Sequence, residues 1–132
     1  MLINRLKEIA PRTFEEKTMS KLRNRVYLIG NLGSDPELNQ FESGKKKASF
    51  TLATNDFYKN QDGERIQDTQ WHNIIAWNHQ AELIENYVKK GQEIAIEGKL
   101  TTRSYEDQKG ITRYITEVIL NELLLLGSQN RK

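Results

Sequence analysis

From residue 19 on, the pattern of apolar and polar residues is mostly that of β-strands, either as short apolar runs or as alternation with a period of two. Residues 26–29 form a short apolar run that ends at a Gly-Asn-Leu-Gly stretch and an Asp-Pro turn. Because successive side chains of a strand point to opposite faces, alternation over several residues predicts a half-buried strand. The other stretches with strand character are 48–54, 70–77, 93–105 and 114–125. The sequence therefore predicts five strands.

Turn signals join these strands into two long hairpins, and one helix interrupts their order. Asp62-Gly63 lies within the polar stretch 56–68, and residues 107–110 separate the last two strands. Between the third and fourth strands, Asn78 is expected to cap a short helix that Gly91 closes. The residues expected on the buried face of this helix are Ala81, Ile84 and Val88.

Three strands, one helix and two strands follow each other in the order of an all-β, five-stranded Greek-key barrel. A small β-sandwich has a similar number of strands and remains the alternative from the pattern alone. We expect residues 19–126 to form this single domain. Residues 1–18, in which Leu2, Leu6 and Ile9 have helical spacing, are expected to be an extension that is either helical or disordered. Residues 127–132 are expected to be a short C-terminal end.

Composition excludes several classes of protein without naming a partner. The 132 residues include 20 Lys and Arg against 18 Asp and Glu, so the placement of charge matters more than its sum. The absence of cysteine excludes a disulfide scaffold, a thiolate metal site and a cysteine nucleophile. No apolar stretch approaches the ~20 residues that span a bilayer, and the N-terminus does not resemble a signal peptide. We expect a cytoplasmic domain without membrane contact.

The third predicted strand carries both tryptophans of the chain on one face. Trp71 and Trp77 share this face with Asn73 and Ile75, whereas Ile74 and Ala76 point to the other face and can serve the core. A face that combines large rings with a polar amide is unusual for a core. Taken singly, however, a tryptophan in a strand is more often a core or interface residue than a platform for a ligand.

The fourth predicted strand adds positively charged side chains to these aromatic residues. Its outward face is expected to carry Lys99, Arg103 and Tyr105, and Tyr58 and Lys59 stand at the mouth of the first hairpin. The residues expected to point inward are Ile94, Ile96, Gly98, Leu100 and Thr102. Aromatic rings interleaved with cations suit single-stranded nucleic acid, because each stacked base contributes about 1–3 kcal/mol and cations follow the phosphates.

Catalytic and metal-binding patterns do not stand out. His72 and His79 have no matching Cys or carboxylate spacing, which argues against a metal site. Phosphodiester hydrolysis needs a carboxylate cluster or a nucleophile with its base, and neither is evident. The basic run at residues 45–47 is expected in a solvated turn, within reach of phosphate. We therefore expect that the protein is not an enzyme and that it binds neither a metal nor a cofactor.

Five stretches of the sequence resemble bacterial single-stranded DNA-binding proteins. They are 24–37 (NRVYLIGNLGSDPE), 50–55 (FTLATN), 69–76 (TQWHNIIA), 81–91 (AELIENYVKKG) and 96–118 (IEGKLTTRSYEDQKGITRYITEV). The resemblance extends over residues 22–126 in order. It implies an oligonucleotide-binding (OB-fold) barrel, usually a homotetramer in the nucleoid, that binds single strands without sequence specificity during DNA replication, recombination and repair.

The resemblance also implies roles for individual residues. The stacking positions of the family correspond to Tyr58, Trp71, Trp77 and Tyr105, and the family often has a basic residue where this chain has Asn73. His72 matches a position that the family uses in subunit contacts, so an oligomer interface is expected there. The full set of residues expected at the DNA is Tyr58, Lys59, Trp71, Asn73, Trp77, Lys99, Arg103 and Tyr105.

Two functions remain open at this point. The family usually ends in an acidic tip that recruits replication and repair proteins, and residues 127–132, which end in Arg-Lys, do not match it. Without that tip, a primosome or replication-restart adaptor that acts mainly through protein partners is the alternative. Four stacking rings favour the binding of single-stranded DNA instead. Stacking does not distinguish DNA from RNA, since only contacts to the 2′-hydroxyl do so.

Overall fold

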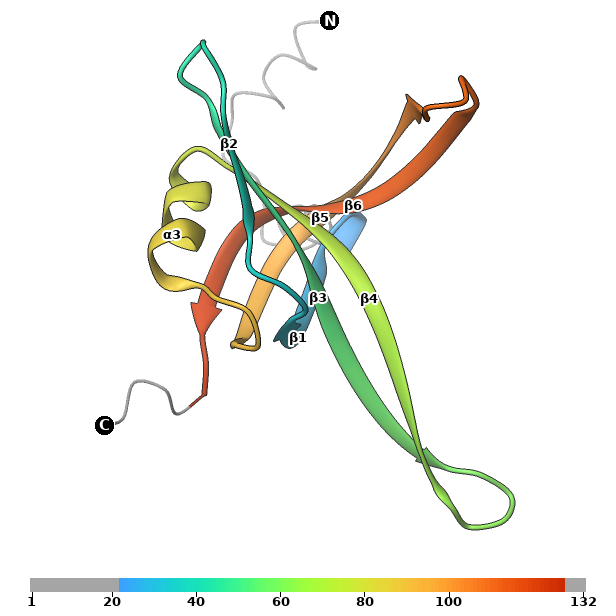
Figure 1. Cartoon of the computed structure of the whole chain (residues 1–132). Coiled ribbons are helices and arrows are strands. Elements are labelled where there is room, and N and C mark those ends of the chain that lie inside the picture. The colour runs from blue at the N-terminus through green and yellow to red at the C-terminus, as the bar shows by residue number, and fades with distance from the viewer. Residues whose placement is uncertain (1–21, 128–132) are drawn as a thin grey trace, which may run out of the picture.

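The computed structural model describes residues 22–127, so the expectations for residues 1–18 and for most of the C-terminal end fall outside the described part. The elements are β1 (Val26–Leu32), β2 (Glu37–Gln40), β3 (Lys46–Lys59), β4 (Arg65–Trp77), α3 (His79–Tyr87), β5 (Glu93–Glu106) and β6 (Thr112–Leu125) (Figure 1). No helix within these residues is long and apolar enough to cross a membrane.

The strands close into a five-stranded barrel although six segments are present. The sheet order is β1-β5-β6-β4-β3-β2, and an additional β1–β3 pairing closes it. The end of β1 pairs with β3 at Leu32↔Leu52, and β2 resumes the same path at Glu37↔Ser49. Residues 33–36 thus interrupt one bent strand that consists of β1 and β2. The sequence pattern predicted only its first part, β1. The predicted all-β barrel with one short helix is confirmed.

The core is formed by the inward faces of the strands and by one face of α3. Leu52, Ile74, Ile84 and Ile94 are the largest fully buried side chains. The predicted helix face is buried as expected, since Ala81, Ile84 and Val88 all belong to the core cluster. Asn78 takes the predicted N-cap position of the helix, but its side chain makes no capping hydrogen bond. Its Oδ1 instead accepts a hydrogen bond from the backbone N–H of Lys46, 3.2 Å away.

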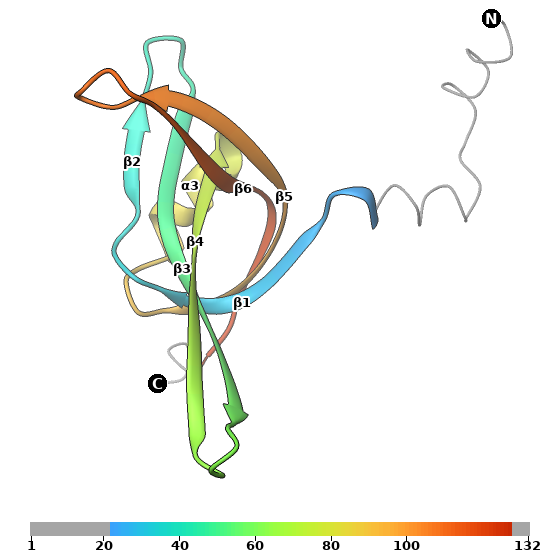
Figure 2. The same cartoon turned by 90° about the vertical axis from the view of Figure 1, so that its right-hand side faces the viewer.

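Two antiparallel arms extend beyond the barrel, one formed by β3 and β4 and the other by β5 and β6 (Figures 1 and 2). The β3–β4 pairing continues to Lys59↔Arg65, so the polar stretch 56–68 is mostly strand rather than loop. On β5, the inward alternation ends at Gly98, next to a register shift at Glu97/Gly98. Leu100 and Thr102 were predicted to point into the core and are exposed, because the strand leaves the barrel there.

Candidate nucleic-acid interface

Strand register joins the outward sides of four neighbouring strands into one surface. Thr51 of β3 lies opposite Asn73 of β4, Asn73 lies opposite Glu117 of β6, and Glu117 lies opposite Thr101 of β5. Residues two apart along each strand share this side. We call this surface the outer face; its members include Lys47, Ser49, Thr51, Trp71, Asn73, Trp77, Lys99, Thr101, Arg103, Tyr105 and Glu117.

Trp71 is the most open ring on the outer face, with 61% of its surface exposed. It lies against Gly33, at which an added Cβ would be 2.5 Å from the indole Cζ3 atom and 2.8 Å from Thr51 Oγ1. Only a glycine leaves room for the ring at this point. Gly33, between β1 and β2, therefore positions Trp71. Strand alternation had predicted the face on which Trp71 lies, but it did not indicate the contact with Gly33.

Trp77 lies about 20 Å from Trp71 along β4 and is surrounded by other aromatic and basic side chains. Phe41 stacks on it with ring centroids 6.2 Å apart. The Nζ atoms of Lys45 and Lys47 lie 5.9 and 5.8 Å from the ring centroid, within the range of cation–π attraction. The predicted solvated turn at residues 45–47 is thus partly strand and flanks Trp77. No pattern in the sequence indicated Phe41, since its contact with Trp77 depends on the β2–β3 hairpin.

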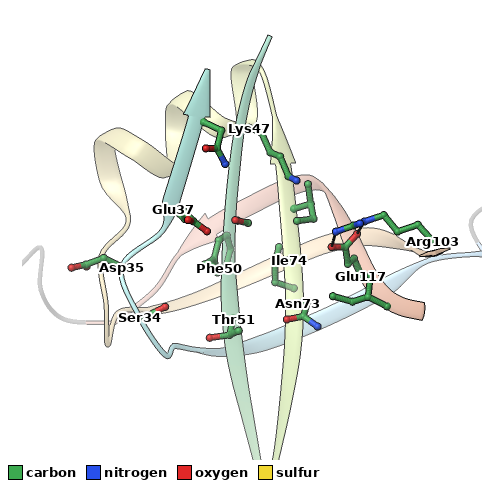
Figure 3. A pocket seen from close by; sticks show the side chains of 14 residues that line it. Ser34, Asp35, Glu37, Lys47, Phe50, Thr51, Asn73, Ile74, Arg103 and Glu117 are labelled. Atoms are coloured by element: carbon green, nitrogen blue, oxygen red, sulfur yellow. Dashed lines mark hydrogen bonds and ion pairs between the residues drawn. The ribbon is translucent and has the colours of Figure 1, made fainter. Parts of the chain in front are cut away.

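A cavity of about 390 Å³ opens on the outer face, and residues between the two tryptophans on β4 line it (Figure 3). Asn73 and Thr51 line it from β4 and β3, and Arg103 and Glu117 line it from β5 and β6. Hydroxyl, amide and guanidinium groups can donate or accept hydrogen bonds along the edge of a base. The cavity therefore suits a polar planar group that lies between the two tryptophans of β4.

Arg103 is held in place by a buried carboxylate of the outer face. Its Nε and Nη2 atoms lie 3.0 and 3.1 Å from the two oxygens of Glu117, which is only 5% exposed. The hydrogen bonds to Glu117 raise the pKa of Arg103 above its usual value. A guanidinium has five N–H donors, so about three remain for a phosphate or a base. The Cζ atom also lies 5.9 Å from the centroid of the Tyr105 ring.

The remaining predicted site residues occupy three different places. Tyr105 and Lys99 are exposed on the outer face of β5, as the alternation predicted. Lys59 and Tyr58 are exposed on the β3–β4 arm, where Tyr58 points away from the side that carries Trp71. His72 is half-buried, and its Nε2 atom lies 3.0 Å from Thr54 Oγ1 in a hydrogen bond. The structure thus joins Trp71, Trp77, Asn73, Lys99, Arg103 and Tyr105 and separates Tyr58 and His72 from them.

Metal binding finds no support among residues 22–127, which contain no group of three or more His, Cys, Asp or Glu side chains able to hold an ion.

The turn that ends the β5–β6 arm is fixed by Asp107. Its Oδ1 accepts hydrogen bonds from the backbone N–H groups of Ile111 and Lys109, each at 2.9 Å, and its Oδ2 lies 3.0 Å from Arg113 Nε. The backbone bond from Ile111, together with Arg113, lowers the pKa of Asp107 below its usual value. This carboxylate therefore keeps the turn, and with it the arm that bears Tyr105, in a fixed shape.

We predict that acid loosens this turn before it unfolds the barrel. A carboxyl group whose folded pKa is lowered adds stability above its unfolded pKa, and that contribution is lost as the pH falls through the folded value. For Asp107 the loss should begin below about pH 4, the usual Asp pKa. Titration of the Asp107 carboxyl carbon by NMR should give a midpoint below about pH 4, the usual value of an Asp side chain. A midpoint at or above that value would contradict the prediction.

Comparison with known proteins places the chain in a family. Residues 23–126 match the single-strand binding protein family. A single-stranded DNA-binding protein of Bacteroides thetaiotaomicron is 47% identical over 106 residues, 79% of this chain and 66% of that protein. Single-stranded DNA-binding protein 1 of Chlorobaculum tepidum is 41% identical over 113 residues, 85% of this chain and 70% of that protein. The chain thus spans about two thirds of the length of these relatives.

A solved structure agrees with the sequence matches. It is described as a Plasmodium falciparum SSB complex with ssDNA, and it superimposes with a TM-score of 0.71 at 33% identity. The match covers 79% of this chain and 95% of that one. Members of this family are DNA-binding proteins rather than enzymes, in agreement with the expectation from sequence. The chain belongs to the single-strand binding protein family.

Proposed function

We propose that this protein binds single-stranded DNA without sequence specificity and protects it during replication, recombination and repair. The observation that carries this proposal is the outer face, on which exposed Trp71 and the Trp77 cluster flank a polar cavity. The relatives that bear the name single-stranded DNA-binding protein support it. The adaptor alternative is not favoured, because the relatives described above are named single-stranded DNA-binding proteins.

Different side chains stack on the bases and contact the phosphates. Bases stack on Trp71, Trp77 and Tyr105, and on Tyr58 where the resemblance implies it, since every base has an aromatic face. Phosphates contact Lys99, Lys59 and the free N–H groups of Arg103. Asn73 lies between the tryptophans and reaches base edges rather than phosphates. The binding domain is assigned to residues 19–126, and the protein acts in the cytoplasm, at the nucleoid, where DNA is present.

A homo-oligomer, expected to be a tetramer, belongs to this proposal. Along residues 26–30, β1 pairs only with β5, so the other edge of β1 has unpaired backbone groups among the described residues. Tyr27 and Ile29 stand on this segment with 68% and 59% of their surfaces exposed. An open strand edge with apolar side chains is a template for pairing with a second chain. His72 is assigned to subunit contacts on the resemblance, and the acidic recruiting tip is not part of the proposal.

The test is the tryptophan fluorescence of the whole chain during titration with poly(dT) at several salt concentrations. Both tryptophans lie on the outer face, so strong quenching is expected when bases stack on them. Each neutralised phosphate should contribute about −0.7 to the slope of log affinity against log salt. The same titration with poly(rU) measures the preference for DNA. A folded protein whose fluorescence does not change with either polymer would contradict the proposal.

A further inference from the structure

The two sides of the β3–β4 arm carry different side chains. The register runs without a shift from Lys47↔Trp77 to Lys59↔Arg65, so alternation assigns each arm residue to one side. Phe57, Lys59 and Arg65 share the side that carries Trp71. Tyr58, which pairs with Ile66, lies on the opposite side. We call the first side the basic side of the arm and the second the acidic side.

Charge is separated between these two sides. Lys59 and Arg65 lie directly opposite each other on the basic side, and neither has an ion pair among the described residues. On the acidic side, Asp56 lies directly opposite Asp68, next to the Tyr58 pair. Like charges that face each other across strands destabilise a sheet. Two adjacent cations without an ion-pair partner among the described residues are therefore best explained by an anion that binds between them.

The basic side also offers a flat platform. The ring of Phe57 is 52% exposed, and the Cζ atom of Arg65 lies 4.1 Å from its centroid. A guanidinium held over a ring is a surface on which a base can stack, while its N–H groups at the edge remain available to phosphate. An exposed aromatic ring beside two cations has the chemistry of a contact for single-stranded nucleic acid.

A hydrogen-bonded belt connects this platform to the main interface. Asn55 Oδ1 accepts hydrogen bonds from Gln67 Nε2 at 2.9 Å and from Thr69 Oγ1 at 2.6 Å. Asn55 and Thr69 lie between Phe57 and Trp71 on the same side of the arm, over a path of about 14 Å, and Gln67 lies directly opposite Phe57. They hold the two strands together and keep carboxylates out of the path of a phosphate backbone.

We propose that single-stranded DNA leaving Trp71 continues along the basic side of the β3–β4 arm, where Phe57 and Arg65 stack a base and Arg65 and Lys59 bind its phosphates. This inference rests on the proposed function and adds a binding site to it. Asp56 and Asp68 repel phosphate from the other side, so Tyr58 contributes less to the affinity than Phe57.

The experiment measures poly(dT) affinity and its salt dependence for the whole chain and for five variants, of which Trp71→Ala reports on the outer face alone. Phe57→Ala should weaken binding about 5- to 150-fold, the loss of one stacked base. Arg65→Ala should weaken binding and reduce the salt slope by about 0.7, the loss of one neutralised phosphate. Tyr58→Ala should weaken binding less than Phe57→Ala. Tyr87→Ala, which removes an exposed ring from α3, is the matched control and should bind like the wild type.

Each contrary result has a separate meaning. Wild-type affinity for Phe57→Ala, an unchanged salt slope for Arg65→Ala, or a larger loss for Tyr58→Ala than for Phe57→Ala would overturn the proposed path along the arm. If Trp71→Ala weakens binding while the Phe57 and Arg65 variants do not, the proposed function stands and this inference alone fails. If the wild-type protein does not bind poly(dT), both fail together. Thermal melts of every variant confirm that the barrel remains folded.

Discussion

Replacement of both Trp71 and Trp77 by alanine is expected to weaken the binding of single-stranded DNA on the order of 10²- to 10⁴-fold. Each ring that stacks a base contributes about 1–3 kcal/mol, and about 1.4 kcal/mol corresponds to a factor of ten. The two rings lie ~20 Å apart and share no partner, so their losses should add. No other pair of side chains on the outer face offers as much aromatic surface to a base.

The measurement uses the anisotropy of a fluorescently labelled dT oligonucleotide, because the double variant has no tryptophan to quench. Trp77 also packs on Phe41, so a thermal melt must show that the fold survives. The Tyr87→Ala variant serves as the control for the removal of an exposed ring. If the folded double variant binds the oligonucleotide with an affinity within about threefold of that of the wild type, both tryptophans have structural roles and do not stack bases.

Strand alternation predicted the faces correctly where the barrel is regular. It placed Trp71, Trp77 and Asn73 on one side of β4 and Ile74 on the other, and the structure buries Ile74 completely. This succeeds because a half-buried strand separates apolar from polar residues with a period of two. The same rule failed at Leu100, which is exposed, because no opposing layer covers β5 once it leaves the barrel.

Contacts that depend on register could not be predicted from one sequence. The stacking of Phe41 on Trp77 requires the turn between β2 and β3 to bring residue 41 over the end of β4. The ion pair between Arg103 and Glu117 requires the exact pairing of β5 with β6. Hydrophobic patterns constrain a register only where one face is buried, and both contacts lie on the outward side. The side of the arm on which Tyr58 lies likewise became evident only from the pairing.

Gly30→Ala is expected to lower the free energy of unfolding by about 3 kcal/mol or more. Gly30 is buried where β1 leaves β5 and turns toward β3 to close the barrel. An added Cβ would lie 2.1 Å from the backbone oxygen of Ala53, and a backbone atom cannot move aside as a flexible side chain can. Overpacking of a core usually costs about 1–3 kcal/mol of stability. Because the added Cβ would collide with the backbone of β3, which closes the barrel, we expect a cost at or above the upper end of this range.

Gly110→Ala provides a control that separates steric collision from backbone strain. Gly110 has a positive φ of 79° and no atom within 4 Å of an added Cβ, so the change should cost only about 1–2 kcal/mol. Thermal unfolding and hydrogen exchange check both variants. In Gly30→Ala, the amide of Gly33, which donates to Thr51 O at 3.0 Å, should lose protection as β1 separates from β3. If Gly30→Ala melts no lower than Gly110→Ala, close β1–β3 contact is not what holds the barrel shut.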